Sequence, residues 1–272
     1  MKLLICTDGS SVSIKTADLF IDLRFHTSTQ ITVLGVNEKG SDLENLHAAM
    51  DLIDQKLGSI YPIDRKIRNG DPIEEIISEA LENSYDLVAV GGGGGQMGLL
   101  NRKLGSTTKK LARKLHTHFL VARNVPKKLE KVLFCTGSEA PASMTMKLGG
   151  EWISNSDAKI GLLHVLPQKS DGMQSTVEEP DASANNRIEK QDKILTQASN
   201  ELKNAGVRNE INFRNRQGLV VDEIIDELSD GNYELLVVGA HYQPGQDRWQ
   251  GTLFDDITDQ LLNRCTCSVL II

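Results

Sequence analysis

The residues of this chain best suited to binding a ligand are five consecutive glycines, 91–95. They directly follow the apolar segment 87–90, which is typical of a buried β-strand. Because glycine has no side chain, the backbone N–H groups of such a loop can approach a ligand closely. The run therefore predicts a loop whose main chain binds a polar ligand.

A second polar group follows a short distance along the chain. Gly105, Ser106 and Thr107 precede a segment in which Leu111 and Leu115 recur at helical spacing, which predicts a helix beginning near Ser106. Free N–H groups and the positive end of the helix dipole make a helix N-terminus a site for anions. The loop and the helix start together suit a polyphosphate, although a flexible turn followed by an ordinary serine cap would give the same pattern.

Other chemical signals are incomplete. The glycines also fit the dinucleotide-binding fingerprint, but they would follow the fourth strand rather than the first, and the acidic residue expected about 20 positions later is absent. Ser106 and Lys109 have the spacing of a serine–lysine nucleophile without the other elements of that motif. The sequence has no Gly-Lys-Ser/Thr phosphate loop, and its histidines lack metal-binding spacing. We therefore assign no catalytic residue and no metal ligand.

The composition is that of an ordinary globular protein, with 39% hydrophobic and 25% charged residues. The formal net charge of −7 argues against a nucleic-acid partner. No apolar run approaches the roughly 20 residues that span a bilayer, and the N-terminal segment reaches Asp8 too soon for a signal peptide. We expect a cytoplasmic protein that contacts neither nucleic acid nor a membrane.

The four cysteines fit a reducing compartment. Cys6 and Cys135 lie in apolar strand segments, which favours a core role. Cys265 and Cys267 form a Cys-x-Cys sequence that lacks the spacing of redox or zinc motifs, so we interpret them as structural.

The 272-residue chain contains two copies of one unit. Residues 68–91 and 216–239, offset by 148, are identical at ten of 24 positions. Near the start of each copy the offset is only 129, so the second copy carries an insert; the polar segment 167–186 is the expected one and predicts a long loop. We expect domains at 1–124 and 131–272, with a linker near 124–130.

Each copy alternates strands with helices. In the first copy we expect strands at 2–6, 30–36, 63–68, 86–90 and 118–122, and helices near 11–23, 42–57, 72–83 and 106–115. In the second we expect strands at 131–135, 159–166, 210–214, 234–238 and 268–272, and helices near 142–154, 186–205, 220–228 and 255–264. The predicted fold class is α/β: two tandem Rossmann-like open parallel sheets of strand order 3-2-1-4-5, with helices on both faces. In that order the first and fourth strands are neighbours, so Asp8 and the glycines would lie at one crevice.

Three motifs resemble those of the universal stress protein family: Thr7-Asp8-Gly9-Ser10, Arg68-Asn69-Gly70-Asp71-Pro72, and Gly92-x2-Gly95-x9-Gly105-Ser106. The resemblance covers nearly the whole chain, twice over, and implies a tandem member. In the family the third motif marks the branch that binds ATP. Its loop holds ribose and phosphates, its Gly-Ser/Thr takes the phosphates, and an aspartate after the first strand lies by the nucleoside.

The resemblance implies that ATP binds the first copy; magnesium bridging the phosphates is an open addition. The nucleoside would lie by Asp8 and Val36, with the ribose and phosphates at the loop and the following helix start. Two registers of the loop stay open, because the second and fifth glycines of the run, or the first and fourth, can fill the motif. The implied site residues are Asp8, Val36, Gly91, Gly92, Gly94, Gly95, Gly105, Ser106 and Thr107.

The second copy has lost most of these residues. It has no counterpart of Asp8 between Thr136 and Gly137, and Tyr242 stands where the second glycine should be. We expect it to bind ATP poorly or not at all, and to act as a partner for the first copy. Family members commonly pair through their fifth strands, and the apolar segments 119–122 and 269–272 predict an intramolecular pseudo-dimer here. A further homodimer stays open.

The resemblance thus implies a cytoplasmic, ATP-binding regulatory protein of the stress response. Two alternatives stay open: a scaffold that binds no nucleotide, and a slow ATPase. Asp8 is the one nearby carboxylate and would lie by the nucleoside, so no residue is placed to activate water. The sequence therefore favours binding over catalysis.

Overall fold

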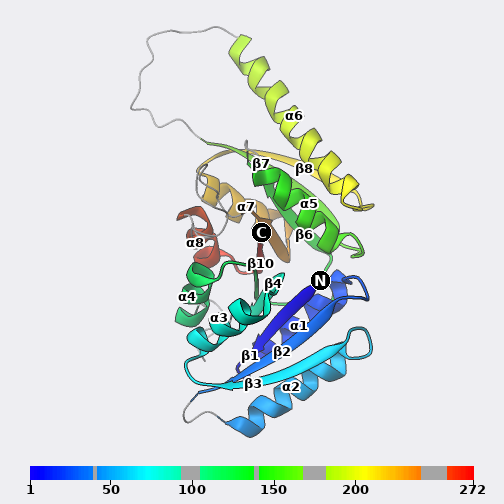
Figure 1. Ribbon diagram of the computed structural model, residues 1–272. Helices are drawn as coiled ribbons and strands as arrows, with labels where there is room; N and C mark the ends of the chain where they lie inside the picture. Colours follow the sequence, from blue (N-terminus) through cyan, green and yellow to red (C-terminus); the bar gives the residue numbers. More distant parts are fainter. Residues whose placement is uncertain (39–41, 93–104, 138–140, 168–181, 240–255) are drawn as a thin grey trace.

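The computed structural model describes residues 1–38, 42–92, 105–137, 141–167, 182–239 and 256–272. These residues form two similar halves (Figure 1). The strands of the first half are β1 (Lys2–Thr7), β2 (Gln30–Asn37), β3 (Ile63–Asn69), β4 (Leu87–Gly91) and β5 (His118–Ala122). Its helices are α1 (Ser11–Leu23), α2 (Leu43–Leu57), α3 (Pro72–Asn83) and α4 (Ser106–Lys114).

The second half repeats this order. Its strands are β6 (Lys131–Thr136), β7 (Lys159–Pro167), β8 (Ile211–Gly218), β9 (Leu235–Val238) and β10 (Ser268–Ile271). Its helices are α5 (Pro141–Ile153), α6 (Ala182–Asn204), α7 (Val220–Gly231) and α8 (Asp256–Arg264). Each expected element is present within a few residues of its predicted bounds. The expected insert loop overlaps α6, which begins at Ala182, and residues 168–181 of it lie outside the described residues.

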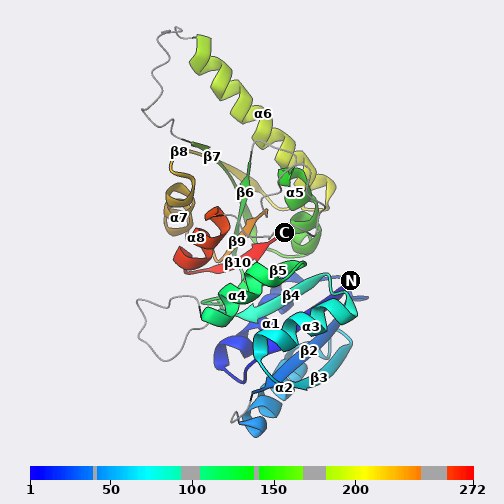
Figure 2. The same ribbon diagram turned by 60° about the vertical axis from the view of Figure 1, so that its left-hand side comes forward.

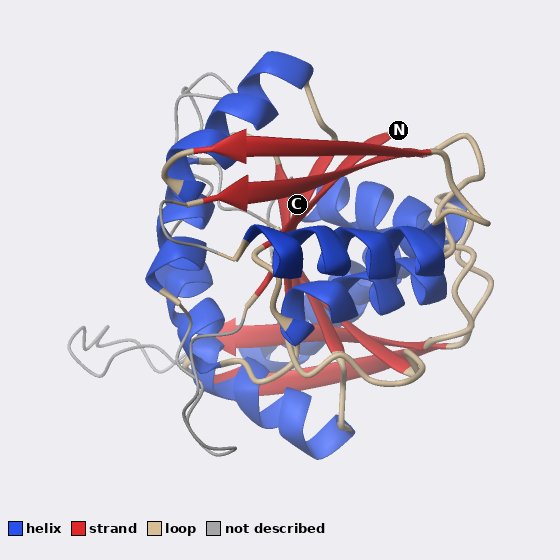
Figure 3. Ribbon diagram, turned by 90° about the horizontal axis from the view of Figure 1, so that it is seen from below, coloured by secondary structure: helices blue, strands red, loops and turns tan. Residues whose placement is uncertain are grey.

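All ten strands belong to one sheet, ordered β3-β2-β1-β4-β5-β10-β9-β6-β7-β8. Each half has the predicted order 3-2-1-4-5. Within each half neighbouring strands are parallel, whereas β5 and β10 pair antiparallel at the centre, with Val121 opposite Val269 (Figure 2). The two expected sheets are thus joined through their fifth strands, as the apolar segments predicted. The junction covers two strand edges that would otherwise expose unpaired backbone groups. Figures 1 and 3 accordingly show the C-terminal end in the middle of the molecule.

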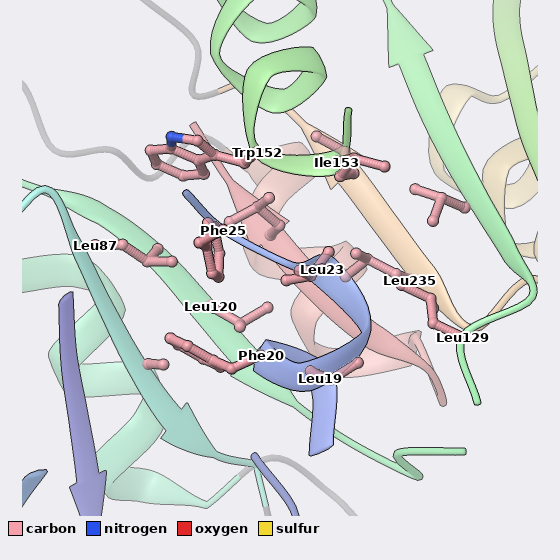
Figure 4. Packing of buried hydrophobic residues seen from close by; sticks show 14 of the residues in the cluster. Leu19, Phe20, Leu23, Phe25, Leu87, Leu120, Leu129, Trp152, Ile153 and Leu235 are labelled. Atoms are coloured by element: carbon pink, nitrogen blue, oxygen red, sulfur yellow. The ribbon is translucent and has the colours of Figure 1, made fainter. Parts of the chain in front are cut away.

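Two hydrophobic cores cover the faces of this sheet, and each extends through both halves. One lies under α1, α2, α5 and α6 and contains Leu3; the other lies under α3, α4, α7 and α8 and contains Leu4. This alternation follows from successive strand side chains pointing to opposite faces. Figure 4 shows the first core where the halves meet: the Phe25 ring lies 6.4 Å from that of Trp152. Since neither core ends at the linker, the two halves form one packed unit.

The buried cysteines agree with a structural role. Cys6, Cys265 and Cys267 are buried and Cys135 is partly buried. Burial raises the pKa of the Cys6 and Cys135 thiols, and a protonated thiol is a poor nucleophile. None of the described helices is long and apolar enough to cross a bilayer.

Each half also buries one glutamate between its third helix and its third strand. Glu79 of α3 accepts hydrogen bonds from Lys66 Nζ (2.8 Å), Arg68 Nε (2.8 Å) and the Tyr85 hydroxyl (2.7 Å). In the second half, Glu227 of α7 accepts from Arg216 Nε at 2.7 Å. Because a buried carboxylate is costly without partners, these bonds fix the outer strands against their helices.

The start of the third helix differs between the halves. Asp71 precedes α3, and its Oδ1 accepts from the N–H groups of Ile73 (2.9 Å) and Glu74 (3.1 Å). Leu219 precedes α7 with nearly the same backbone angles but offers no acceptor, and 67% of it is exposed. The helix α7 therefore begins without a side-chain cap.

This pair gives a stability prediction. Leu219→Asp should stabilise the protein by about 0.5–1 kcal/mol, because a carboxylate would bond the free N–H groups and favour the helix dipole. Asp71→Leu should destabilise it by about 1 kcal/mol. Urea unfolding midpoints measure both. An unchanged or lower midpoint for Leu219→Asp would contradict the assignment of the missing cap.

Candidate functional site

The carboxyl end of the sheet in the first half brings several predicted site residues to one edge. In the strand register Thr7 lies opposite Gly35, and Cys6 lies opposite Val90. The residues that follow, Asp8, Val36 and Gly91, therefore lie at the same level on three neighbouring strands. This is the edge at which ligands bind in open parallel sheets.

The turn after β1 is held by its own side chains. Asp8 is exposed, and its Oδ1 accepts from the N–H of Ser10 at 2.9 Å. Ser10 caps α1 by accepting from the N–H of Ser13 at 3.2 Å, and the Ser13 hydroxyl lies 2.7 Å from that of Thr7. Gly9 has a φ of +82°, a conformation that favours glycine. The sequence Thr7-Asp8-Gly9-Ser10 thus positions the N-terminus of α1 at the edge of the sheet.

Gly91 is a glycine because α1 lies against it. A Cβ at this position would be 2.9 Å from the backbone nitrogen of Ser13 and 3.0 Å from its Cα. The close approach was predicted for a ligand, but here it serves the packing of α1 on β4. The N-terminus of α1 consequently lies directly beside the end of β4.

Gly92 is a glycine for a similar reason. A Cβ there would be 2.6 Å from Cγ1 of Val121 and 2.7 Å from Cγ of Arg123. The Arg123 side chain occupies that space, and its Nε donates to the carbonyl oxygen of Gly92 at 3.4 Å. Gly94 and Gly95 lie outside the described residues, so the register of the loop stays a prediction.

Among the described residues, no side chain caps the start of α4. Its cap residue is Gly105, which makes no side-chain hydrogen bond to the helix, and Ser106 and Thr107 are exposed. The first turn contains no acidic residue. Because α4 returns the chain from the end of β4 to the start of β5, its N-terminus lies at the same edge of the sheet as Asp8 and Gly91. The N-termini of α1 and α4 therefore both direct positive dipole ends toward this edge.

Val36 lies at the expected level, but its side chain belongs to the core under α3 and α4 and is 8% exposed. Only a small part of it is free to line a pocket. Within the described ranges, no three His, Cys, Asp or Glu side chains lie together as metal ligands would.

The corresponding edge of the second half differs in its residues. His164 of β7 stands opposite Thr136, the position that Gly35 occupies in the first half. Its imidazole is buried and lies 3.2 Å from the carbonyl oxygen of Thr136. The helix α8 is the counterpart of α4, and its Asp259 accepts a hydrogen bond from Nη2 of Arg113 of α4 at 3.0 Å.

Arg123 lies at the sheet edge of the first half and was not identified from the sequence. It is 6% exposed, although it follows the last residue of β5 and looks like an ordinary polar strand end. Burial lowers the pKa of its guanidinium, because desolvation penalises the cation. The sequence signal that could have identified Arg123 was a charged residue placed directly after the apolar, fully buried segment 119–122.

Fold and edge together define a class: an α/β protein of two Rossmann-like units joined through their fifth strands, in which the N-termini of α1 and α4 lie at one sheet edge of the first unit. Comparisons with known proteins agree. The model of the "Universal stress protein family" matches residues 1–123 and again 128–272. The chain belongs to the universal stress protein family, as a tandem member.

Solved structures share the fold over the whole chain. A universal stress protein from Archaeoglobus fulgidus is 17% identical, with a TM-score of 0.66 over 99% of this chain and 97% of that chain. A putative universal stress protein from Pseudomonas aeruginosa is 14% identical, with a TM-score of 0.69 over 100% and 92%. The cytoplasmic domain of a prokaryotic cation chloride cotransporter has the same fold at 11% identity, with a TM-score of 0.56 over 99% and 94%. No curated protein sequence matches the chain.

Proposed function

We propose that the chain binds ATP in its first half and acts as a nucleotide-dependent regulatory protein of the stress response. The proposal rests on one observation. The N-terminus of α4 carries exposed Ser106 and Thr107 and no side-chain cap, at the sheet edge that also holds Asp8.

Electrostatics favour a polyphosphate at this position. The first turns of α1 and α4 contain no acidic residue, whereas α4 ends with Arg113 and Lys114. No side chain in the described part of the chain caps the start of α4, so its N–H groups can bind phosphate oxygens, as helix N-termini commonly do. Asp8, on the neighbouring strand end, would accept hydrogen bonds from the ribose hydroxyls.

The second half lacks these features, so the expected stoichiometry is one ATP per chain. His164 fills the position of Gly35, and the sequence of the second half has no counterpart of Asp8 between Thr136 and Gly137. The expected activity is binding rather than hydrolysis. Asp8 is the carboxylate expected to lie by the nucleoside, and its Oδ1 is already bonded to the N–H of Ser10.

A nucleotide-free scaffold is the second candidate. The observation that favours it is that Gly91 and Gly92 need no ligand to explain them, because α1 and Arg123 occupy the space beside them. Under this alternative the glycines serve packing alone.

Isothermal titration of ATP, and of AMP, into the purified protein with magnesium tests the proposal. We expect one ATP per chain, and a loss of affinity of at least about tenfold in Gly105→Val, equivalent to roughly 1.4 kcal/mol. A valine fits the extended backbone at Gly105, and its side chain would cover the start of α4.

Gly137→Val is the matched control, because Gly137 lies after β6 with open space beside it. It should leave ATP binding unchanged. A stoichiometry of two would refute the asymmetry between the halves. No heat, with no nucleotide released on denaturing the purified protein, would favour the scaffold.

A further inference from the structure

Arg123 contacts both halves of the molecule. Its Nε donates to the carbonyl oxygen of Gly92, the residue that follows β4. Its Nη1 donates to the carbonyl oxygens of Leu262 (3.0 Å) and Cys265 (2.6 Å), at the C-terminal end of α8. One guanidinium thus joins the strand end that enters the glycine-rich sequence to the last turn of a helix in the other half.

The last turn of α8 is also what compensates the buried charge. Among the described residues no carboxylate pairs with Arg123, and its Nη2 is buried without a hydrogen-bond partner. Unpaired carbonyl groups and the negative end of the dipole make a helix C-terminus favourable for a cation. Arg123 is therefore held by α8. A shift of Arg123 or of α8 would expose the guanidinium to solvent or leave it buried without compensation.

The contact with Gly92 is close and specific. The Cγ and Nε of Arg123 lie only 2.7 and 2.9 Å from where a Cβ of residue 92 would stand. Interfaces packed this closely pass on displacement rather than absorb it. A movement of Gly92 must therefore move the Arg123 side chain.

The backbone of Arg123 is fixed to β10 at the same place. Its N–H donates to Oγ of Ser268 at 3.0 Å, and that hydroxyl donates to the carbonyl oxygen of Arg123 at 3.1 Å. The amide of Asn124 donates to the carbonyl oxygen of Thr266 at 2.8 Å. Because its main chain is fixed to β10, Arg123 can respond to a movement of Gly92 or of α8 only through its side chain, which lies between them.

We propose that Arg123 is a coupling residue, which transmits changes at the end of β4 in the first half to the C-terminal turn of α8 in the second. If the first half binds ATP, as proposed above, the bound state is then felt in the half that binds none. The second half would then change its conformation in response to ATP, rather than serve only as a packing partner.

The coupling can be tested without any nucleotide. Gly92→Ala pushes on the Arg123 side chain and on Cγ1 of Val121, whereas Gly91→Ala pushes on the backbone of Ser13 instead. We expect Gly92→Ala to speed amide hydrogen exchange in residues 262–267 about tenfold, a typical allosteric coupling. Exchange in β1 reports global unfolding and serves as the reference. Gly91→Ala should leave residues 262–267 unchanged relative to that reference.

Two variants of Arg123 separate coupling from simple stabilisation. Arg123→Met should abolish the effect of Gly92→Ala on α8. Arg123→Lys can still bond the helix-end carbonyls through one ammonium group but lacks the fork that also spans to Gly92. It should restore most of the stability without restoring the coupling. An effect of Gly92→Ala that persists in Arg123→Met, or that Gly91→Ala reproduces, would overturn the proposal.

Adding ATP extends the hydrogen-exchange test, and it provides a second measurement of the coupling if Gly92→Ala fails to fold. ATP should slow exchange in residues 262–267 of the unmodified protein but not of Arg123→Met. ATP that binds without this protection would overturn the coupling. A protein that binds no ATP refutes the proposed function alone, because the Gly92→Ala arm still decides the role of Arg123. Where that variant also fails to fold, the coupling is tested in reverse: Leu262→Ala, which loosens the turn of α8 that holds Arg123, should speed exchange of the Gly92 amide, which donates to the carbonyl oxygen of Ala122, but should not do so in Arg123→Met.

Discussion

Glu79→Ala should lower the free energy of unfolding by about 3 kcal/mol at neutral pH. The carboxylate is 1% exposed and is bonded by Lys66, Arg68 and Tyr85. Its removal leaves two cations and a buried hydroxyl facing a cavity. The effect lies at the lower end of the range for buried ion pairs, because the Lys66 and Arg68 side chains keep contact with water.

The same network predicts a pH dependence. Although burial acts to raise it, the pKa of Glu79 is lowered by the hydrogen bonds from Lys66, Tyr85 and Arg68. A carboxyl group with a lowered folded-state pKa contributes stability that is present above its unfolded pKa, near 4.3, and is lost as the pH falls through the folded value. Stability of the unmodified protein should therefore fall with acidification below that point more steeply than stability of Glu79→Ala.

Urea unfolding at neutral pH and at a pH below the unfolded pKa of the carboxyl group measures both effects. Glu227→Ala is the matched control. Glu227 also pairs with two cations, Arg216 at 2.7 Å and Arg214 at 3.1 Å, but its tyrosine hydroxyl, that of Tyr233, lies farther away, at 3.4 Å. We expect Glu227→Ala to be destabilising by a smaller amount. A Glu79→Ala protein as stable as the unmodified one would refute the role assigned to the network.

Gly91→Ala should destabilise the protein by about 2 kcal/mol, because the new methyl group would collide with the backbone of α1. Backbone atoms cannot rotate away as a flexible side chain can, so the helix must shift. Since α1 begins with the turn that carries Asp8, the shift also displaces a predicted ligand contact. Weaker ATP binding should accompany the lower stability.

Thermal unfolding and ATP titration measure the two consequences of Gly91→Ala. Gly137→Ala is the control, because nothing lies within 4 Å of its new Cβ. An unchanged melting temperature for Gly91→Ala would show that α1 does not need the glycine. Lower stability with unchanged ATP affinity would separate the packing of α1 from the binding site.

Much of the fold followed from local sequence patterns. The alternation of apolar strands with capped, amphipathic helices predicted every described element, and the apolar fifth strands predicted the central junction. These features depend on residues close together in the chain, which is why they can be read from it. The overlap of α6 with the expected loop is an exception, because the segment from Ala182 onward is polar enough to look like a loop.

The site was less readable, because its contacts join distant parts of the chain. Nothing near Gly91 or Gly92 indicates that α1 and Arg123 occupy the space beside them. Likewise, the identities between the two copies indicated a repeated unit but not what the shared residues do. Three of the identical pairs, at Arg68, Glu79 and Tyr85, form the buried network that each half needs to hold its outer strands.

The position of β10 at the centre of the sheet has a consequence for synthesis. On the ribosome β5 is complete long before β10 exists, so the nascent first half carries an open apolar edge at residues 119–122. Its natural partner arrives only after every other strand has been made, and pairing over such a separation is slow. An unfinished chain thus holds an exposed strand edge, the kind of surface that chaperones cover and that aggregates when they do not. Joining the two units in one polypeptide ensures that each fifth strand has a partner, but β5 stays unpaired at this edge until β10, the last strand, has been synthesised.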